Sequence, residues 1–410
     1  MDIITSRFVK VGIINLIIVA TIGVLMRYKI GFEFPYFDQK HLLHAHSHFA
    51  FSGWVTHTLF TLMVLFLKKQ KNIMFNTQKY NVLIIFNLLC AYGMLFAFAM
   101  QGYGFVSISF STISILLGYV YAWFYIGDLK KIPSDHPSKN WFKAALFFNV
   151  LSSLGTFYLA YMMATKHIHQ HAYLGSVYFY LHFQYSGWFF FAIMGLLMSK
   201  LVLASDFKND SFIFNTLALA TIPAFILSVL WLKLPWYVYI FPVFAVILQL
   251  YGLFRLMNLF VKHYYHIKTT WIKPVRIIFG LSFLALSIKF LLQTGSIFPE
   301  ISKLAFGFRS IVIAYLHLVL LAITTLFLLG FMLLQGYIHQ VKLAFTGLIL
   351  FSIGVFANEL VLMVQGIASF GYFLIPYLNE ILLGVSIFML LSLVLILISY
   401  LHKTNIYHQK

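Results

Sequence analysis

Long apolar segments follow one another along the whole chain, and short polar or charged stretches separate them. A segment of about twenty apolar residues is long enough to cross the hydrocarbon core of a bilayer as a helix. The segments lie at about residues 8–27, 45–67, 80–101, 104–127, 141–163, 175–199, 211–232, 235–260, 275–293, 308–333, 343–366 and 375–401. The pattern therefore predicts an all-α membrane protein with about twelve transmembrane helices.

The composition supports the same class of protein. Of the 410 residues, 62% are hydrophobic and only 9% are charged, far too few charges for the surface of a soluble protein. We expect a single polytopic domain, residues 1–410, with the lipid bilayer as its main partner. The formal net charge of +18 does not indicate a nucleic-acid partner, because the Lys and Arg residues lie in short loops between the apolar segments. The single cysteine, Cys90, excludes an internal disulfide and a cluster held by several thiolates.

The charged loops also predict an orientation. With the N-terminus inside, 20 Lys and Arg residues lie on the cytoplasmic side and 7 outside, with Lys289 inside the ninth segment. The positive-inside rule then predicts that both termini are cytoplasmic, in a multi-pass protein of the bacterial cytoplasmic membrane. Lys289 lies near the outer end of its segment, and we expect its long side chain to snorkel to the interface.

Three histidines recur at nearly equal spacing. His48, His182 and His317 are separated by 134 and 135 residues, and the first two begin the same motif, His-Phe-X-X-Ser-Gly-Trp. This period spans four helices, so we expect three pseudo-threefold four-helix repeats, at about residues 1–135, 136–270 and 271–410. The three histidines then share one depth, roughly 5–15 Å below the outer interface at 1.5 Å rise per residue.

Matched histidines favour a ligand site. A single membrane histidine often just hydrogen-bonds a neighbouring helix, but three at one depth point to a metal or a haem. Imidazole binds haem iron, copper and zinc alike, and the apolar, aromatic-rich surroundings favour haem. His44 lies one turn before His48 on the same helical face. It is a candidate second ligand, a partner for a haem propionate, or a residue of a helix interface.

Other polar residues offer alternative chemistry. His44 and His46 on one outer segment, and His167, His169 and His171 on another, are either a copper or zinc site at the membrane surface or solvated loop side chains. Glu359 lies well inside the eleventh segment. It is either a proton carrier or ion ligand, or a protonated carboxyl that hydrogen-bonds a neighbouring helix.

With twelve helices and histidines on the second, sixth and tenth, the chain resembles the haem–copper oxidase superfamily. This family includes the catalytic subunits of terminal oxidases and nitric oxide reductases. The resemblance implies that His48 and His317 are the axial ligands of a low-spin haem b, and that His182 is a ligand of copper or non-haem iron. Two features depart from the family. The seventh helix lacks the adjacent histidine pair, and Tyr315 replaces the first histidine of the His-X-His motif in the tenth. A standard binuclear centre is therefore not encoded.

A second resemblance is to the NnrS-type haem- and copper-containing membrane proteins, through the segment His44-Ala45-His46. Both resemblances favour a membrane cytochrome that handles electrons or binds NO or O₂. Its donor would be quinol or a periplasmic cytochrome, and its partners other subunits of a respiratory complex. If the protein is an enzyme, the resemblance implies an oxidoreductase of the terminal oxidase or nitric oxide reductase type. The alternative is a transporter or channel for metal ions or protons that uses the outer histidine clusters and Glu359.

Overall fold

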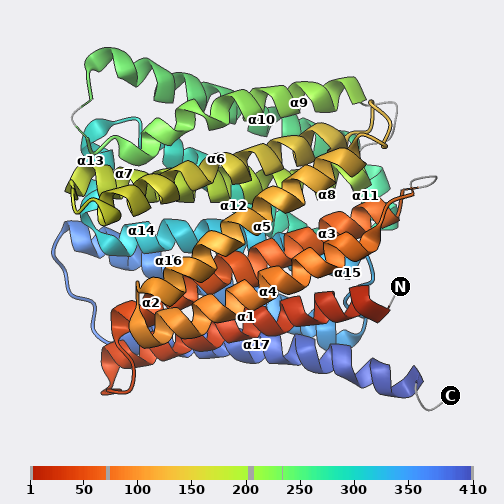
Figure 1. Ribbon diagram of the computed structural model, residues 1–410, viewed down its shortest axis with the longest axis horizontal. Coiled ribbons are helices and arrows are strands. Elements are labelled where there is room, and N and C mark those ends of the chain that lie inside the picture. Colours follow the sequence, from red (N-terminus) through yellow and green to blue (C-terminus); the bar gives the residue numbers. More distant parts are fainter. Residues whose placement is uncertain (1–2, 71–73, 202–206, 233, 408–410) are drawn as a thin grey trace. The chain divides into compact units, whose positions relative to one another are not determined.

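The computed structural model describes residues 3–70, 74–201, 207–232 and 234–407, and within these ranges it contains helices and no strand. Twelve of the described helices are long and apolar enough to cross a membrane, and each coincides with one of the predicted segments (Figure 1). The prediction of an all-α, multi-span membrane protein is therefore confirmed. The orientation of its termini stays a prediction.

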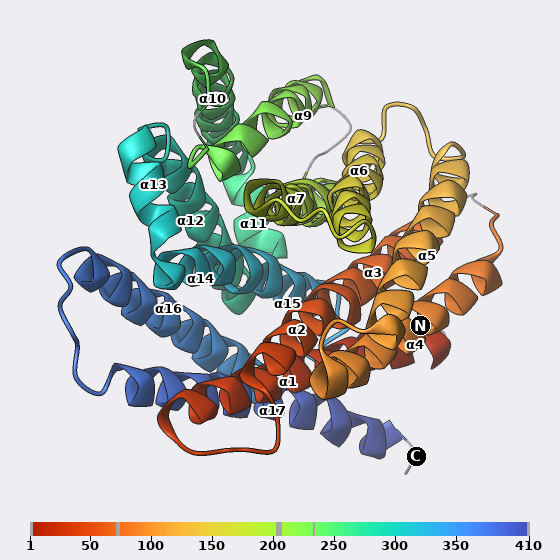
Figure 2. The same ribbon diagram turned by 60° about the vertical axis from the view of Figure 1, so that its left-hand side comes forward.

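The chain divides into two compact units, and the first comprises Met1–Tyr121, Ile272–Leu281 and Thr325–Lys410. Its elements are α1 (Ile3–Gly31), α2 (Gln39–Phe49), η1 (Ala50–Thr56), α3 (His57–Lys68), α4 (Thr77–Gln101), most of α5 (Phe105–Leu129), α15 (Leu326–Leu334), α16 (Lys342–Phe370) and α17 (Leu378–Tyr407). Within this unit α16 lies along α17, and α17 lies along α1 (Figure 2). The helix formed by α2, η1 and α3 is the most buried of its spans.

The second unit comprises Ala122–Trp271 and Ser282–Thr324. Its elements are α6 (Ser138–Ala164), α7 (Gln170–His182), η2 (Phe183–Phe189), α8 (Phe190–Leu201), α9 (Phe207–Thr221), η4 (Pro223–Val229), η5 (Trp236–Tyr239), α10 (Ile240–Lys262), α11 (Tyr264–Thr270), most of α12 (Lys273–Gly295), α13 (Pro299–Gly307), α14 (Arg309–His317) and most of η6 (Leu318–Thr325). Here the most buried span is the one formed by α7, η2 and α8, which packs against α6.

Three π-helical segments interrupt the second, sixth and tenth spans. These are η1, η2 and η6, and each begins one or two residues after one of the repeated histidines His48, His182 and His317. A π segment inserts an extra residue into a helical turn, is rare, and frequently marks a functional site. The hydrophobic pattern predicts the three spans but contains no signal for this change of helical pitch.

A polar side chain from another span contacts each π segment. Asn15 of α1 donates to the Gly53 carbonyl at 2.5 Å, Asn149 of α6 accepts from Gln184 at 2.9 Å, and Ser282 of α12 donates to the Ile323 carbonyl at 2.9 Å. The three supporting residues lie on the first, fifth and ninth spans, 134 and 133 residues apart. A four-helix repeat would produce this recurrence. The single domain and the three repeat boundaries themselves stay predictions.

Candidate functional site

His48 lies at the end of α2 against aromatic residues from the neighbouring span. Its imidazole stacks on Phe98 of α4, with ring centroids 4.2 Å apart and an interplanar angle of 18°. Its Nε2 lies 3.1 Å from the hydroxyl of Tyr103, which follows α4. The His48 side chain is half-buried, so it combines an apolar wall with one polar contact.

His44 faces the same aromatic residues one turn earlier. Its ring meets Tyr103 edge-on, with centroids 4.6 Å apart, and its Nε2 is buried with no hydrogen-bond partner among the described residues. The structure thus brings His44 and His48 together on one face, as their spacing predicts. Sequence reasoning missed Phe98 and Tyr103, since single aromatic residues carry no signal in a chain with 46 Phe and 25 Tyr.

Two further histidines of this span, His46 and His57, turn toward α1 instead. The Nδ1 of His46 lies 3.1 Å from the Val19 carbonyl, and the Nε2 of His57 lies 2.8 Å from the Phe8 carbonyl. Both carbonyls belong to α1, so these two imidazoles link the first two helices. His44 and His46 therefore point to different neighbours.

His182 occupies a fully buried position at the end of α7. Its Nε2 lies 2.9 Å from the Thr221 carbonyl, where α9 ends before Pro223. The 3₁₀ segment η4 starts at Pro223, and the Phe225 amide donates to the Ile222 carbonyl. The Thr221 carbonyl is therefore left to bond with His182. Without His182, this buried carbonyl would lack a hydrogen bond. This contact gives His182 a structural role, and its prediction as a metal ligand stays a prediction.

The third repeated histidine, His317, is the last residue of α14 and directly precedes η6. Its side chain is half-buried, as is that of His48. His317 belongs to the second unit and His48 to the first. Their pairing as axial ligands of one haem stays a prediction.

The outer histidines His167, His169 and His171 are all exposed around the start of α7. The ring of His171 packs edge-on against Trp231 at 5.7 Å. Across the described ranges, no three His, Cys, Asp or Glu side chains gather closely enough to hold a metal ion. The surface copper or zinc site stays a prediction from sequence.

Glu359 lies within α16, where its side chain is half-buried. Its Oε1 accepts a hydrogen bond of 3.2 Å from the amide of the adjacent Asn358. A neutral amide beside the carboxyl is compatible with either predicted role, proton carrier or structural group.

The expectation that Lys289 snorkels is wrong. Its side chain is only 3% exposed, and its Nζ donates to Ser186 Oγ of η2 at 3.0 Å. The side chain cannot extend to the interface because helices of the second unit surround it, among them α9 and α10.

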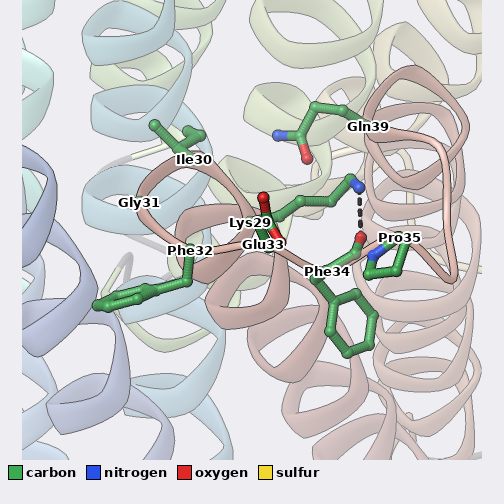
Figure 3. Close-up of a pocket in the computed structure, with 8 residues that line it drawn as sticks. All are labelled: Lys29, Ile30, Gly31, Phe32, Glu33, Phe34, Pro35 and Gln39. Atoms are coloured by element: carbon green, nitrogen blue, oxygen red, sulfur yellow. Dashed lines mark hydrogen bonds between the residues drawn. The ribbon is translucent and has the colours of Figure 1, made fainter.

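A hollow lies in the loop between α1 and α2, as Figure 3 shows. Lys29, Glu33, Phe34 and Gln39 are among its lining residues, and Lys29 Nζ donates to the Phe34 carbonyl at 2.6 Å. Its volume is about 770 Å³, but every lining residue comes from residues 29–39. A single loop supplies no opposing side chains, so we assign no site to it.

No protein-family model and no curated protein matches this chain.

Proposed function

We propose that the protein is a divergent haem–copper-oxidase-like cytochrome of the bacterial cytoplasmic membrane that binds haem b. Its proposed axial ligands are His48 and His317. The observation that supports this best is the pair His44 and His48, two neighbouring imidazoles against Phe98 and Tyr103. Intramembrane polar groups are costly, so two on one face favour a functional role over chance.

The residues present fit a haem. A porphyrin needs an apolar wall, an imidazole for the iron and polar groups for its propionates. Phe98 and Tyr103 form the wall, and the buried Nε2 of His44 has no hydrogen-bond partner in the described part of the chain. When bound, haem would supply one-electron redox chemistry. His48 would hold the iron, and the tyrosine hydroxyl that now meets its Nε2 would give up that contact.

The π segment η1 supports the proposal by fixing the helix directly after His48. Trp54, buried within η1, donates from its indole to Thr325 Oγ1 at 3.0 Å. Ser52 Oγ donates to the His48 carbonyl at 2.7 Å. A ligand is most effective when the backbone that carries it is held rigidly, and these contacts hold the backbone at His48 and within η1.

The missing histidine pair in the seventh span argues against O₂ reduction at a binuclear centre. We therefore favour electron transfer, or binding of NO or O₂ at one haem. Quinol or a periplasmic cytochrome would donate the electron, within or beside a respiratory complex. Copper or non-haem iron at His182 is a less favoured addition, because its Nε2 already contacts the Thr221 carbonyl.

The test is a reduced-minus-oxidised optical spectrum of the full chain, expressed in a host with ample haem and purified in detergent. We expect α and Soret bands in the wild type and their loss in His48→Ala and His317→Ala. Added CO or NO separates the two roles. Bands that shift with neither gas indicate a bis-histidine electron carrier. A Soret band that shifts with either gas indicates an open iron site.

His46→Ala is the matched control, since His46 lies on the same span but contacts the Val19 carbonyl. It should keep the bands. A wild-type protein without colour, or unchanged bands in both ligand variants, would overturn the proposal. A colourless protein would favour the transporter alternative, with Glu359 as its coupling carboxylate.

A further inference from the structure

Lys289 is a buried basic residue with few partners. It lies on α12 within the second unit, and among the described residues its only hydrogen bond goes to the neutral Ser186 Oγ. The rings of Phe290 and Tyr185 lie 5.1 and 6.0 Å from its Nζ. These contacts offer weak attraction to an ammonium, and none of them carries a negative charge.

The surrounding described residues supply no counter-charge. Two titratable side chains face Lys289 from the neighbouring span, Tyr185 and, one turn before it, His182. No carboxylate lies within ion-pair distance of Lys289 among the described side chains. An uncompensated ammonium in an apolar interior costs several kcal/mol, so a charged Lys289 needs an anion from outside the chain.

A small cavity lies directly beside the amine. Its lining includes Lys289, Ser186, Thr221 and Gln249, with apolar walls from Leu217 and two phenylalanines. Its free volume is about 10 Å³, room for one particle near the size of a water molecule. The cavity therefore excludes carboxylates, phosphates and other polyatomic ligands.

The Gln249 side chain is the second polar group of this cavity. It is 4% exposed, and its Oε1 has no hydrogen-bond partner within the described ranges. No described residue bonds this oxygen, and a half-turn of the amide would place its NH₂ donors there instead. An ammonium, a hydroxyl and an amide then surround one small space, a donor set that suits a halide.

We propose that the cavity formed by Lys289, Ser186 and Gln249 binds one small monovalent anion of the chloride type. The anion compensates the charge of Lys289, and it joins α12 to η2 and α10 inside the second unit. This site is independent of haem binding, so either proposal can fail alone.

The experiment is thermal unfolding of the detergent-purified full chain, with chloride replaced stepwise by gluconate at constant ionic strength. A ligand that binds only the folded state raises the Tm, by about 2 °C for a concentration roughly ten times the dissociation constant. We expect this shift with chloride and bromide, and its loss in Lys289→Met. That variant removes the charge but keeps most of the apolar length. Gln249→Leu should weaken the halide dependence at least threefold.

Lys200→Met is the matched control. Lys200 belongs to the same unit but not to the cavity lining, so its variant should keep the full chloride shift. A structure from bromide-containing crystals should show an anomalous peak beside Lys289. A Tm independent of halide in the wild type, or cavity density without an anomalous signal, would show that the site holds water beside a neutral amine and would overturn the proposal.

Discussion

The same motif, His-Phe-X-X-Ser-Gly-Trp, occurs once in each unit and serves two different environments. In the first unit His48 is half-buried against Phe98 and Tyr103, and its backbone is held by side chains of its own unit. In the second unit His182 is fully buried and contacts the Thr221 carbonyl. The comparison teaches that one local sequence can provide either a candidate ligand or a structural link, depending on the neighbouring helices.

The largest expected effect on stability separates the two histidines directly. His182→Ala leaves a cavity and an unpaired Thr221 carbonyl, so we expect a loss of about 2–3 kcal/mol in the free energy of unfolding. His48→Ala removes a half-buried ring and should cost under about 1 kcal/mol in haem-free protein. Denaturant unfolding of both variants measures the difference. Equal losses would show that the two environments are not distinct.

Gly53 and Gly187, the glycines of the shared motif, allow a second comparison of the two units. A Cβ at residue 187 would lie 2.5 Å from the Cβ of Phe148 in α6, whereas one at residue 53 would meet the ring of Phe49 in its own span. The ring of Phe49 can rotate away, but the Cβ of Phe148 moves only with its backbone. We expect Gly187→Ala to cost about 2–3 kcal/mol and Gly53→Ala about 1 kcal/mol, measured by the same unfolding assay. The reverse order would contradict the packing comparison.

Asn15 provides a smaller effect confined to the first unit. Its side chain donates to the Gly53 carbonyl and accepts from the Tyr92 hydroxyl at 2.6 Å. Asn15→Ala removes both bonds and should cost about 1–2 kcal/mol, whereas Tyr92→Phe removes one and should cost about 0.5 kcal/mol. Unfolding measurements on the single and double variants give the coupling. We expect the double variant to be as stable as Asn15→Ala. The Tyr92–Asn15 hydrogen bond that Tyr92→Phe removes is already lost in Asn15→Ala.

The smallest effect lies at the start of α2. Asp38 caps this helix by accepting from the amides of Lys40 and His41 at 2.8 and 2.9 Å. The hydrogen bond from the His41 amide lowers the pKa of the Asp38 carboxyl below its ordinary value. The cap therefore contributes its stability above about pH 4, and this contribution is lost as the pH falls through the lowered pKa. Asp38→Ala should lower the Tm slightly at pH 7. The difference from the wild type should shrink in acid, which a pH series of melting curves would test.

All twelve spans could be predicted from hydrophobic segment length, because a bilayer imposes one length on every helix. The shared face of His44 and His48 was also predictable, since residues four apart are neighbours on any helix. The partners of these histidines could not be predicted. Phe98 lies on another span and Tyr103 directly follows that span. Helix packing in a membrane depends on side-chain shape, which leaves no period in the sequence.

Lys289 also shows the difference between what the sequence predicts and what helix packing decides. Its position near the end of a span suggested an interfacial side chain, but the packing of α9, α10 and η2 around α12 decided that it is buried. The sequence by itself determined the membrane class, the number of spans and the recurrence of histidines, because these depend on composition and on spacing along one chain. Only the tertiary structure decided the π segments, the carbonyl that His182 contacts and the cavity beside Lys289. Each of these depends on groups far apart in sequence, whose contact is set by the packing of whole helices.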